Sequence, residues 1–585
     1  ALVAGREESP KDDEKNHFIA SCRARWRGGL GRWLATAIVI GQDLAPKYPA
    51  LLGTGGNDGR LDFTNNFMQR LVELLADDGV ATAEARHLAK CALFGGPSCG
   101  LIAGKAIGQF LPGGAGGANA TTGFDADSIL NPWDYILMLE GAVQWTATVA
   151  RRLGTGGVSL ITAPFALRSQ GVGHGTAASS EDAPRGEQWM PLWSRPAGIA
   201  EVASLLAEGR LTTGSGPATR PIDAARALAR LGTSRGIDTF QRFGYLERNG
   251  QANLAIPLGR WQVIARPDID LVDHAADWVD RLDRACRGEG IPATWITAAH
   301  RCEEAMLACC RGSEPRHRVV LLVALGEAEA ALARTPAKAR DAGLRPLSHL
   351  PASWLTALPN EPWSRLAVAI AAQQSDELPL RSHWHTADGA EFAKAAGVEV
   401  VVTGHAFVLD GVAILRRRCR HAGAFSLQSG HPHAAGLSDL AALVRGEVDT
   451  AQMWSVIRPL LALDWADSAP LSTPTALSDD LGDLAVAGVL RLTHTATQLS
   501  GAQRVLSVDP GILARLLAGD ISGAVTRAAR RLSGIGQHPH VVSAVGDRNA
   551  AQRLAATLLV PLHPAGLATL AKRLTRPHSA PAINF

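Results

Sequence analysis

The chain has 585 residues, too many for one hydrophobic core, so roughly three to four domains are expected. Its composition, with 46% hydrophobic and 19% charged residues, is that of a globular protein and excludes a disordered or fibrous class. The 58 Lys and Arg residues nearly balance the 55 Asp and Glu residues, which argues against a strongly cationic nucleic-acid binder but not against local basic surfaces.

The longest apolar runs, such as residues 33–40 and 319–325, are too short to cross a membrane, and no targeting peptide is visible. The eight cysteines form no CxxC pair, so the sequence predicts neither a disulfide scaffold nor a zinc site. Reduced thiols indicate a cytoplasmic location. Because the first residue is Ala rather than Met, we expect further residues upstream of it.

The N-terminal elements begin with helical periodicity over residues 22–38, followed by a glycine-rich stretch at 53–59 and an expected extended piece at 60–63. Apolar residues at helical spacing then predict an amphipathic helix over 67–75. Thr64, Asn65 and Asn66 are suitable N-cap residues for it.

A second glycine-rich loop occupies residues 108–123. The segments after it are a helix at 132–152, a strand at 158–168, a loop at 171–186, and helices at 201–209, 222–236 and 268–287. Residues 242–265 predict a β-hairpin, because Asn249-Gly250 is a strong signal for a type I′ turn.

The pattern beyond residue 290 is mostly helical, apart from a β-like segment at 399–415. The expected helices are 318–333, 366–373, 437–445, 451–463, 480–499, 512–532 and 550–574. The sequence therefore predicts an α+β protein in three regions. These are a mixed α/β N-terminal core with β-hairpins at 1–290, a mainly helical region with a short β segment at 291–435, and a C-terminal helical bundle at 436–585.

Catalytic patterns are weak. The stretch 53–59 matches neither the Walker A pattern nor the GxGxxG fingerprint, so no nucleotide cofactor is expected. Asp58 and Asp62, and likewise Asp125 and Asp127, are pairs in or beside glycine-rich loops, where carboxylates commonly cap turns. A two-metal nuclease needs several converging carboxylates. The sequence therefore favours a protein that is not an enzyme and holds no metal.

Three histidine pairs share a spacing of two residues, but each lies in a polar or proline-rich segment without a third ligand. They are His383 with His385, His431 with His433, and His538 with His540. Zinc is therefore the less favoured interpretation for all three pairs.

Binding chemistry fits the two glycine-rich stretches better. Glycine amides can approach a phosphate closely, Asn and Gln can hydrogen-bond to base edges, and Arg binds phosphates. A structural turn explains the first stretch about equally well. The candidate nucleic-acid-binding residues are Gly53, Gly55, Gly56, Asn57, Arg60, Asn65, Asn66, Gln69, Arg70, Gln109, Gly113, Gly114, Gly116, Gly117, Asn119, Arg168, Arg242, Arg248 and Asn249.

Arginines also gather in three clusters. Each is either a phosphate-binding surface or a solvated face in an arginine-rich chain, and the second interpretation is slightly favoured. The clusters are Arg23, Arg25, Arg27 and Arg32; Arg416, Arg417, Arg418 and Arg420; and Arg527, Arg530 and Arg531.

Several motifs closely resemble, in order, the large subunit of type I-G (formerly I-U) CRISPR effector complexes. They are LLGTGGNDGRLDFTNNFMQRL (51–71), KAIGQFLPGGAGGANA (105–120), NPWDYILMLEGA (131–142), APFALRSQGVGHG (163–175), RGEQWMPLWSRPA (185–197) and FQRFGYLERNGQANLAIPLGR (240–260). The resemblance is weaker after residue 300, and residues 375–415 depart from the family's pattern.

The resemblance implies a non-catalytic subunit of a Cascade-type antiviral surveillance complex. Such a subunit lies by the 5′ end of the guide, recognises the protospacer-adjacent motif, helps to separate the strands, stabilises the R-loop and recruits a nuclease. The implied partners are guide RNA (CRISPR RNA), target double-stranded DNA, the backbone and guide-handle-binding Cascade subunits and a helicase-nuclease, with no membrane. The bundle at 436–585 would take the place of a small subunit.

Two alternatives stay open. In the first, the chain is a structural docking subunit that contacts guide-handle RNA and partner subunits without reading DNA. In the second, it is a metal-dependent nuclease.

Overall fold

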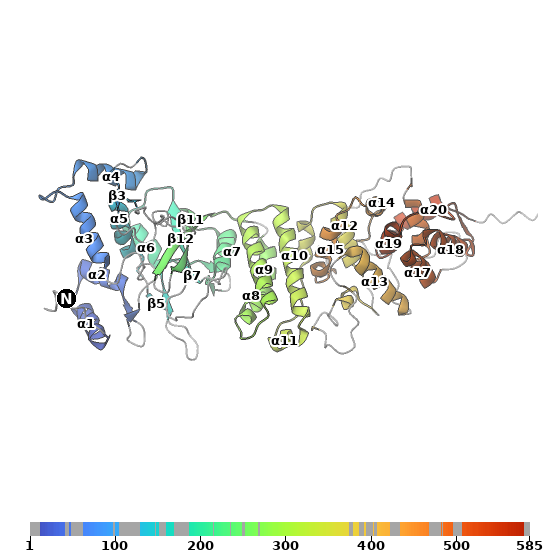
Figure 1. The fold of residues 1–585 in the computed structure, drawn as a ribbon, viewed down its shortest axis with the longest axis horizontal. Helices are drawn as coiled ribbons and strands as arrows, with labels where there is room; N and C mark the ends of the chain where they lie inside the picture. The colour runs from blue at the N-terminus through green and yellow to red at the C-terminus, as the bar shows by residue number, and fades with distance from the viewer. Residues whose placement is uncertain are drawn as a thin grey trace, which may run out of the picture. The chain divides into compact units, whose positions relative to one another are not determined.

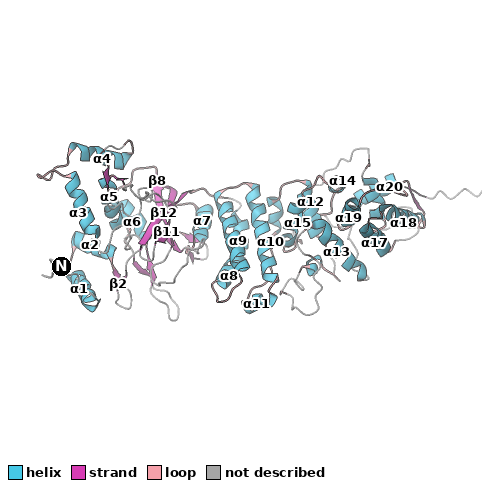
Figure 2. Cartoon of the chain, viewed as in Figure 1, coloured by secondary structure: helices cyan, strands magenta, loops and turns pink. Residues whose placement is uncertain are grey.

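The computed structural model describes most of the chain (Figure 1). The described residues are 12–40, 46–47, 62–97, 100–104, 129–146, 148–150, 160–168, 186–213, 216–233, 236–248, 252–266, 269–373, 378–384, 391–392, 402, 406–421, 433–466, 468, 481–482, 484–494 and 506–577. Backbone contacts divide the chain into two compact units, Ala1–Pro267 and Asp268–Phe585. Helices dominate and the strands form small sheets, so the predicted α+β class is confirmed (Figure 2).

The first unit begins with helices and short strand pairs. They are α1 (Asp12–Arg25), α2 (Gly28–Ala37), β1 (Val39–Ile40), β2 (Pro46–Lys47), α3 (Asp62–Leu74), α4 (Ala83–Phe94), β3 (Ile102–Ala103), β4 (Ile129–Leu130) and α5 (Pro132–Gln144). Helices α2, α3 and α4 all contact α5. The core of this group is made by Leu130, Tyr135 and Leu139, on which Trp33 and Phe67 pack.

Three boundaries differ from the sequence prediction. The helix expected over 22–38 is two helices, and Gly28 at the start of α2 has φ +60°, a left-handed conformation that glycine adopts readily. Helix α3 already begins at Asp62, so the N-cap role of Thr64, Asn65 and Asn66 is wrong, and the extended piece expected over 60–63 is wrong at 62 and 63, the two of its residues that are described. Helix α5 ends at Gln144, and strand β5 (Thr148–Ala150) follows where helix was expected.

A four-stranded antiparallel sheet forms the second part of this unit, in the order β12-β11-β8-β7. The strands are β7 (Ala166–Arg168), β8 (Gly186–Trp193), β11 (Ile237–Arg248) and β12 (Ala252–Gln262). The predicted hairpin is confirmed as β11–β12, but Arg248 pairs with Ala252, which leaves three residues in the connection instead of two. The strand expected over 158–168 is two strands, β6 (Leu160–Thr162) and β7. Sequence reasoning did not predict β8.

Aromatic side chains of this sheet and of the residue before β7 pack against one another. The Phe240 ring lies between Phe165 and Trp189, with ring centroids 5.4 and 6.0 Å away. Trp189 also contacts Trp261, at 5.5 Å. All four residues are buried, so this aromatic cluster holds β8, β11 and β12 together.

The remaining elements of the first unit are short. They are α6 (Ile199–Glu208), β9 (Thr212–Thr213), β10 (Gly216–Pro217) and α7 (Pro221–Leu231). Helix α6 confirms the segment predicted over 201–209, whereas α7 ends at Leu231, before the end of the segment predicted over 222–236.

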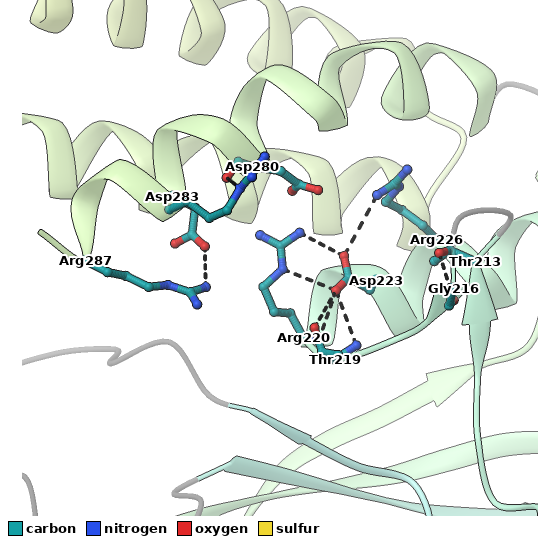
Figure 3. A network of polar contacts seen from close by, with 10 residues as sticks. Thr213, Gly216, Thr219, Arg220, Asp223, Arg226, Asp280, Asp283 and Arg287 are labelled. Carbon is teal, nitrogen blue, oxygen red and sulfur yellow. Dashed lines mark hydrogen bonds and ion pairs between the residues drawn. The ribbon is translucent and has the colours of Figure 1, made fainter. Parts of the chain in front are cut away.

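Asp223 organises the start of α7 (Figure 3). Its carboxylate accepts hydrogen bonds from the Arg220 backbone at 3.1 Å and from the Arg220 guanidinium at 2.8 Å. Arg226 lies 3.9 Å away on the same helix. Burial alone raises the pKa of Asp223, but the hydrogen bonds and the positive charge of Arg220 outweigh burial, so the pKa lies below its ordinary value.

We expect Asp223→Asn to destabilise the protein by about 1–2 kcal/mol near neutral pH, because charged hydrogen bonds at the helix start are removed. A depressed carboxyl pKa gives stability that is present above the unfolded pKa of about 3.9 and is lost as pH falls through the folded value. Urea midpoints should therefore differ at neutral pH and converge in acid. Asp77→Asn, at an exposed position, is the control. A difference that persists unchanged in acid would contradict the ionic origin.

In the described part of the second unit, the elements are helices apart from two short strands. Its first helices are α8 (Ile269–Cys286), α9 (Ala293–Arg311), α10 (Pro315–Ala333), α11 (Pro336–Asp341), η4 (Ala352–Ala357), α12 (Pro362–Ala371), η5 (Leu380–His383) and α13 (Phe407–Arg420). Then follow α14 (Leu437–Arg445), α15 (Thr450–Leu460), α16 (Leu484–Leu492), α17 (Pro510–Ala518), α18 (Ile521–Ser533), β13 (Gln537–Pro539), α19 (Arg548–Thr557), α20 (Pro564–Leu574) and β14 (Thr575–Pro577).

Four segments of the second unit differ from expectation. The helix expected over 480–499 is shorter, because α16 covers Leu484–Leu492 and the described residues 481–482 and 493–494 are not helical. The β-like segment at 399–415 is wrong where it is described, because α13 covers most of it. The helix expected over 512–532 is two helices, since Gly519 closes α17 with φ +84° and Asp520 caps α18. The helix expected over 550–574 is also two, because α19 ends before the second begins at Pro564.

The expected boundary at residue 435 runs through packed helices. Helix α12 contacts α14 and α15, and α13 contacts α19. The middle region and the C-terminal bundle of the sequence prediction are thus parts of one compact unit.

Ionic groups are buried in this unit. Glu329 on α10 is 1% exposed, accepts a hydrogen bond from the Leu347 amide at 3.0 Å, and pairs with Arg381 and with Arg458, the latter at 3.5 Å. Burial lowers the pKa of Arg458. The negative charge of Glu329 raises this pKa, and the positive charge of Arg381 lowers it further, so the pKa lies below its ordinary value. One carboxylate thus joins α10, η5 and α15.

Two further arginines converge on the C-terminal end of α19. Arg491 donates to the Leu558 carbonyl at 2.6 Å. Arg418 donates to Gln373 at 2.8 Å, and the Gln373 amide in turn donates to the Leu559 carbonyl at 2.7 Å. Burial lowers the pKa of Arg491 to about 9 and that of Arg418 to about 10. The partial negative charge of the helix end offsets part of the cost of burying them.

Within the part of the chain that the structure describes, no helix combines the length and the apolar character needed to cross a bilayer.

Candidate nucleic-acid interface

The described flanks of both glycine-rich stretches belong to one hydrophobic cluster. Helix α3 begins right after the first stretch, and its Phe67 packs on Leu130 and its neighbours. The second stretch lies between β3 and β4, which pair through Ile102 and Leu130. Ile102 packs on the same cluster. Both stretches are thus attached to one packed group of elements.

Asn131 and Trp133, from the motif NPWDY, fix α5 within that group. The Asn131 side chain accepts a hydrogen bond from the Trp133 amide at 3.1 Å and donates to the Leu88 carbonyl at 2.9 Å. The Trp133 indole donates to the Ala85 carbonyl at 2.8 Å. Asn131 therefore caps α5 and ties it to α4, right after β4, the described C-terminal flank of the second glycine-rich stretch.

The candidates on α3 separate into buried and exposed side chains. Arg70 is fully buried, with its Nε 3.0 Å from Glu73, and Asn66 is also buried. Gln69 is exposed and accepts a weak contact from Arg70 at 3.4 Å. Of these three side chains, only that of Gln69 is placed to meet a ligand from solvent. For Asn65 the structure describes the helical backbone alone.

Arg242 on β11 is engaged within the sheet. Its Nε and a terminal nitrogen donate to the Glu187 carboxylate on β8 at 2.9 and 2.8 Å. The guanidinium also lies 5.0 Å from the Trp189 ring and 5.8 Å from the Trp261 ring. A bidentate ion pair next to two indole rings leaves this arginine little freedom to hold a phosphate.

Arg168 and Arg248 are strand residues, on β7 and β11, whose side chains the structure does not describe. The other candidates lie outside the described residues: Gly53, Gly55, Gly56, Asn57, Arg60, Gln109, Gly113, Gly114, Gly116, Gly117, Asn119 and Asn249.

The groups considered for metal chemistry are dispersed. Asp62 begins α3, whereas Asp58, Asp125 and Asp127 lie outside the described residues. Among the residues that the structure describes, no three His, Cys, Asp or Glu side chains gather as a metal site would require.

The two described histidines of the pairs at 383–385 and 431–433 are buried. Burial, together with Arg418, Arg417 and His421, lowers the pKa of His383 to about 3. His433 contacts the Ser468 hydroxyl at 2.6 Å and the Trp465 ring. His538 is on β13 and His540 follows it, where its amide donates to the Leu574 carbonyl.

The three arginine clusters differ in their surroundings. In the second, Arg418 is buried, and Arg417 donates to the Ser382 carbonyl at 2.9 Å. In the third, Asp509 pairs with Arg527 at 2.6 Å and with Arg531 at 3.5 Å. All four arginines of the first, on and between α1 and α2, are exposed.

Glu187 was not found from the sequence. It lies 55 residues before its partner Arg242, and neither residue carries a local signal of the pairing. Asn131-Pro132 was detectable, because Asn followed by Pro is a typical helix start.

Neither a comparison with protein-family models nor a search of curated proteins finds a match to this chain.

Proposed function

We propose that the chain is the non-catalytic large subunit of a type I-G CRISPR surveillance complex in the cytoplasm. It recognises a short motif in duplex DNA, and base pairing with the guide RNA then reads the adjoining target. One geometric observation supports this proposal. The described flanks of both glycine-rich stretches, represented by Phe67, Ile102 and Leu130, pack in the same cluster.

A shared anchor suits a reader of DNA, because two loops fixed on one rigid group can act on neighbouring parts of a groove. Glycine backbone enters where side chains would clash, and amides of Asn or Gln read or wedge the adjacent base pair. Gln69, exposed on α3, is the described side chain best suited to this role. Arg70 and Arg242 are not assigned phosphate contacts, since their guanidinium groups are buried.

The test is duplex binding by the reconstituted guide-loaded complex, with and without this chain, on targets that carry a library of flanking motifs. We expect motif-dependent binding only when the chain is present. The loop variants Gly55→Val/Gly56→Val and Gly114→Val/Gly116→Val should assemble, and at least one should lose most of the preference for motif over non-motif DNA. Val80→Thr, at an exposed position next to α4, is the control and should keep the preference.

Other results would favour the alternatives. If the loop variants fail to join the complex and any complex that forms keeps its DNA preference, the stretches dock the chain onto a partner subunit. Cleavage that depends on divalent metal and is lost in Asp58→Ala or Asp125→Ala would indicate a nuclease. Motif preference that is unchanged without the chain would reject the proposed reading function.

A further inference from the structure

The first arginine cluster lies in a stretch where positive charge is not balanced. Residues 15–42 contain five Lys or Arg residues and no Asp or Glu, although the whole chain is almost neutral. Arg23, Arg25, Arg27 and Arg32 are all exposed on α1, α2 and the turn between them. Within the described residues, none of the four forms an ion pair with a carboxylate. We call this surface the α1–α2 arginine patch.

Two of these arginines have a structural role and two do not. Arg27 donates to the carbonyls of Arg23 and Trp26 at the end of α1, and Arg23 donates to the Ile38 carbonyl. These bonds orient the turn between the helices. In the described part of the chain, neither Arg25 nor Arg32 donates a side-chain hydrogen bond to another group. Contacts within the fold thus do not account for the positive charges of Arg25 and Arg32.

The patch is fixed to the group that anchors the glycine-rich stretches. Trp33, next to Arg32 on α2, packs on the Leu130 and Tyr135 cluster. Helix α2 also contacts α5 directly. The patch and the described flanks of the two stretches are therefore attached to one packed group within the first unit.

We infer that the α1–α2 arginine patch binds the phosphodiester backbone of duplex DNA, an assignment that rests on the proposed function and adds a surface to it. Exposed arginines without acidic partners neutralise phosphates and release condensed counterions. Phe18, Trp26 and Trp33 are all partly buried, so the patch offers no fully exposed Phe, Tyr or Trp ring. Single-strand binders stack bases on such rings, and their lack here favours a duplex.

The experiment measures duplex affinity of the full-length chain as a function of salt, from about 50 to about 200 mM, on DNA with and without the motif. Arg25→Gln/Arg32→Gln should reduce the salt slope of log affinity by about 2, because each removed guanidinium leaves one phosphate without a cation. Both DNAs should be affected equally, because phosphate contacts carry no base sequence. Arg25→Lys/Arg32→Lys should keep most of the slope, which excludes a folding defect as the cause.

Arg345→Gln/Arg553→Gln is the matched control, because it removes the same charge from two exposed positions of the second unit that belong to none of the three arginine clusters. An unchanged slope in Arg25→Gln/Arg32→Gln, with normal binding by the wild type, overturns the assignment and leaves the proposed function intact. Binding of single-stranded RNA is measured in parallel. If Arg25→Gln/Arg32→Gln binds duplex DNA normally but loses RNA binding, the patch contacts RNA and the duplex assignment is overturned. No duplex binding by the wild type, alone or in the guide-loaded complex, rejects the assignment and the proposed function together.

Discussion

Replacing Arg242 with methionine is expected to destabilise the protein by about 3–5 kcal/mol, because it leaves the Glu187 carboxylate buried without its partner. The two side chains are only 9% and 12% exposed, and their ion pair is bidentate. Glu187 would keep one contact, the hydrogen bond from the Trp189 indole at 2.8 Å. Trp189 and Trp261 would also lose the cation that lies within about 6 Å of both rings.

Chemical denaturation followed by tryptophan fluorescence measures this effect. Arg260→Met is the matched control, since Arg260 is exposed on the neighbouring strand β12 and should cost less than about 0.5 kcal/mol. The double variant Arg242→Met/Glu187→Gln should recover much of the loss, because no unpaired charge remains. If Arg242→Met keeps wild-type stability and instead weakens DNA binding, Arg242 is the phosphate contact that the sequence predicted.

Glu329→Gln is expected to have a comparable or larger effect on the second unit, about 3–5 kcal/mol. The glutamine keeps an oxygen for the Leu347 amide, so the helix and its contacts stay sterically possible. It removes the negative charge that Arg381 and Arg458 share. These two side chains are 14% and 15% exposed, and their mutual repulsion would then be uncompensated.

Glu327→Gln on the same helix is the control. Glu327 is 51% exposed and forms an ion pair with Arg301 at 2.8 Å, of the surface kind that contributes at most about 1 kcal/mol. Urea unfolding and hydrogen exchange of α10 and α15 should separate the two variants clearly. If the two substitutions lower the free energy of unfolding equally, burial of the Glu329 carboxylate does not determine how much it contributes to stability.

Helices with a strong apolar face could be predicted closely. The helix expected over 268–287 is α8, Ile269–Cys286, because Leu271, Ala275, Trp278 and Leu282 repeat at helical spacing and all are buried. Helix breaks were harder to place. Gly519 and Asp520 are residue types that commonly end one helix and cap the next. The apolar pattern continues on both sides of them, however, and for that reason the sequence predicted one helix over 512–532.

Helix α13 shows where local pattern failed. Its segment is rich in Val, Ile and Phe, which favour strands. Yet Phe407, Ile414 and Leu415 are spaced for one helix face and are buried against neighbouring helices. Packing overrides local propensity here. The four-stranded sheet was only partly predicted, because β8 lacks a simple alternation of apolar and polar residues.

The candidate interface was predicted as segments rather than as side chains. Glycine content and motif order identified the two stretches, and both are attached to the same cluster. Which arginines are free depends on partners that the chain brings from far away. Arg242 meets Glu187 across strands and Arg70 is enclosed by its surroundings, and residue type alone reveals neither.

The position of Glu329 also bears on how the chain folds as it is made. Arg381 follows Glu329 by 52 residues, and Arg458 comes later still. A nascent chain that has released α10 but not α15 carries this carboxylate without its full set of partners, and burying it then is unfavourable. We therefore expect the packing around Glu329 to be completed late in synthesis. Contacts between α10 and α15 can form only after α15 has left the ribosome, so this part of the core should close after the earlier helices.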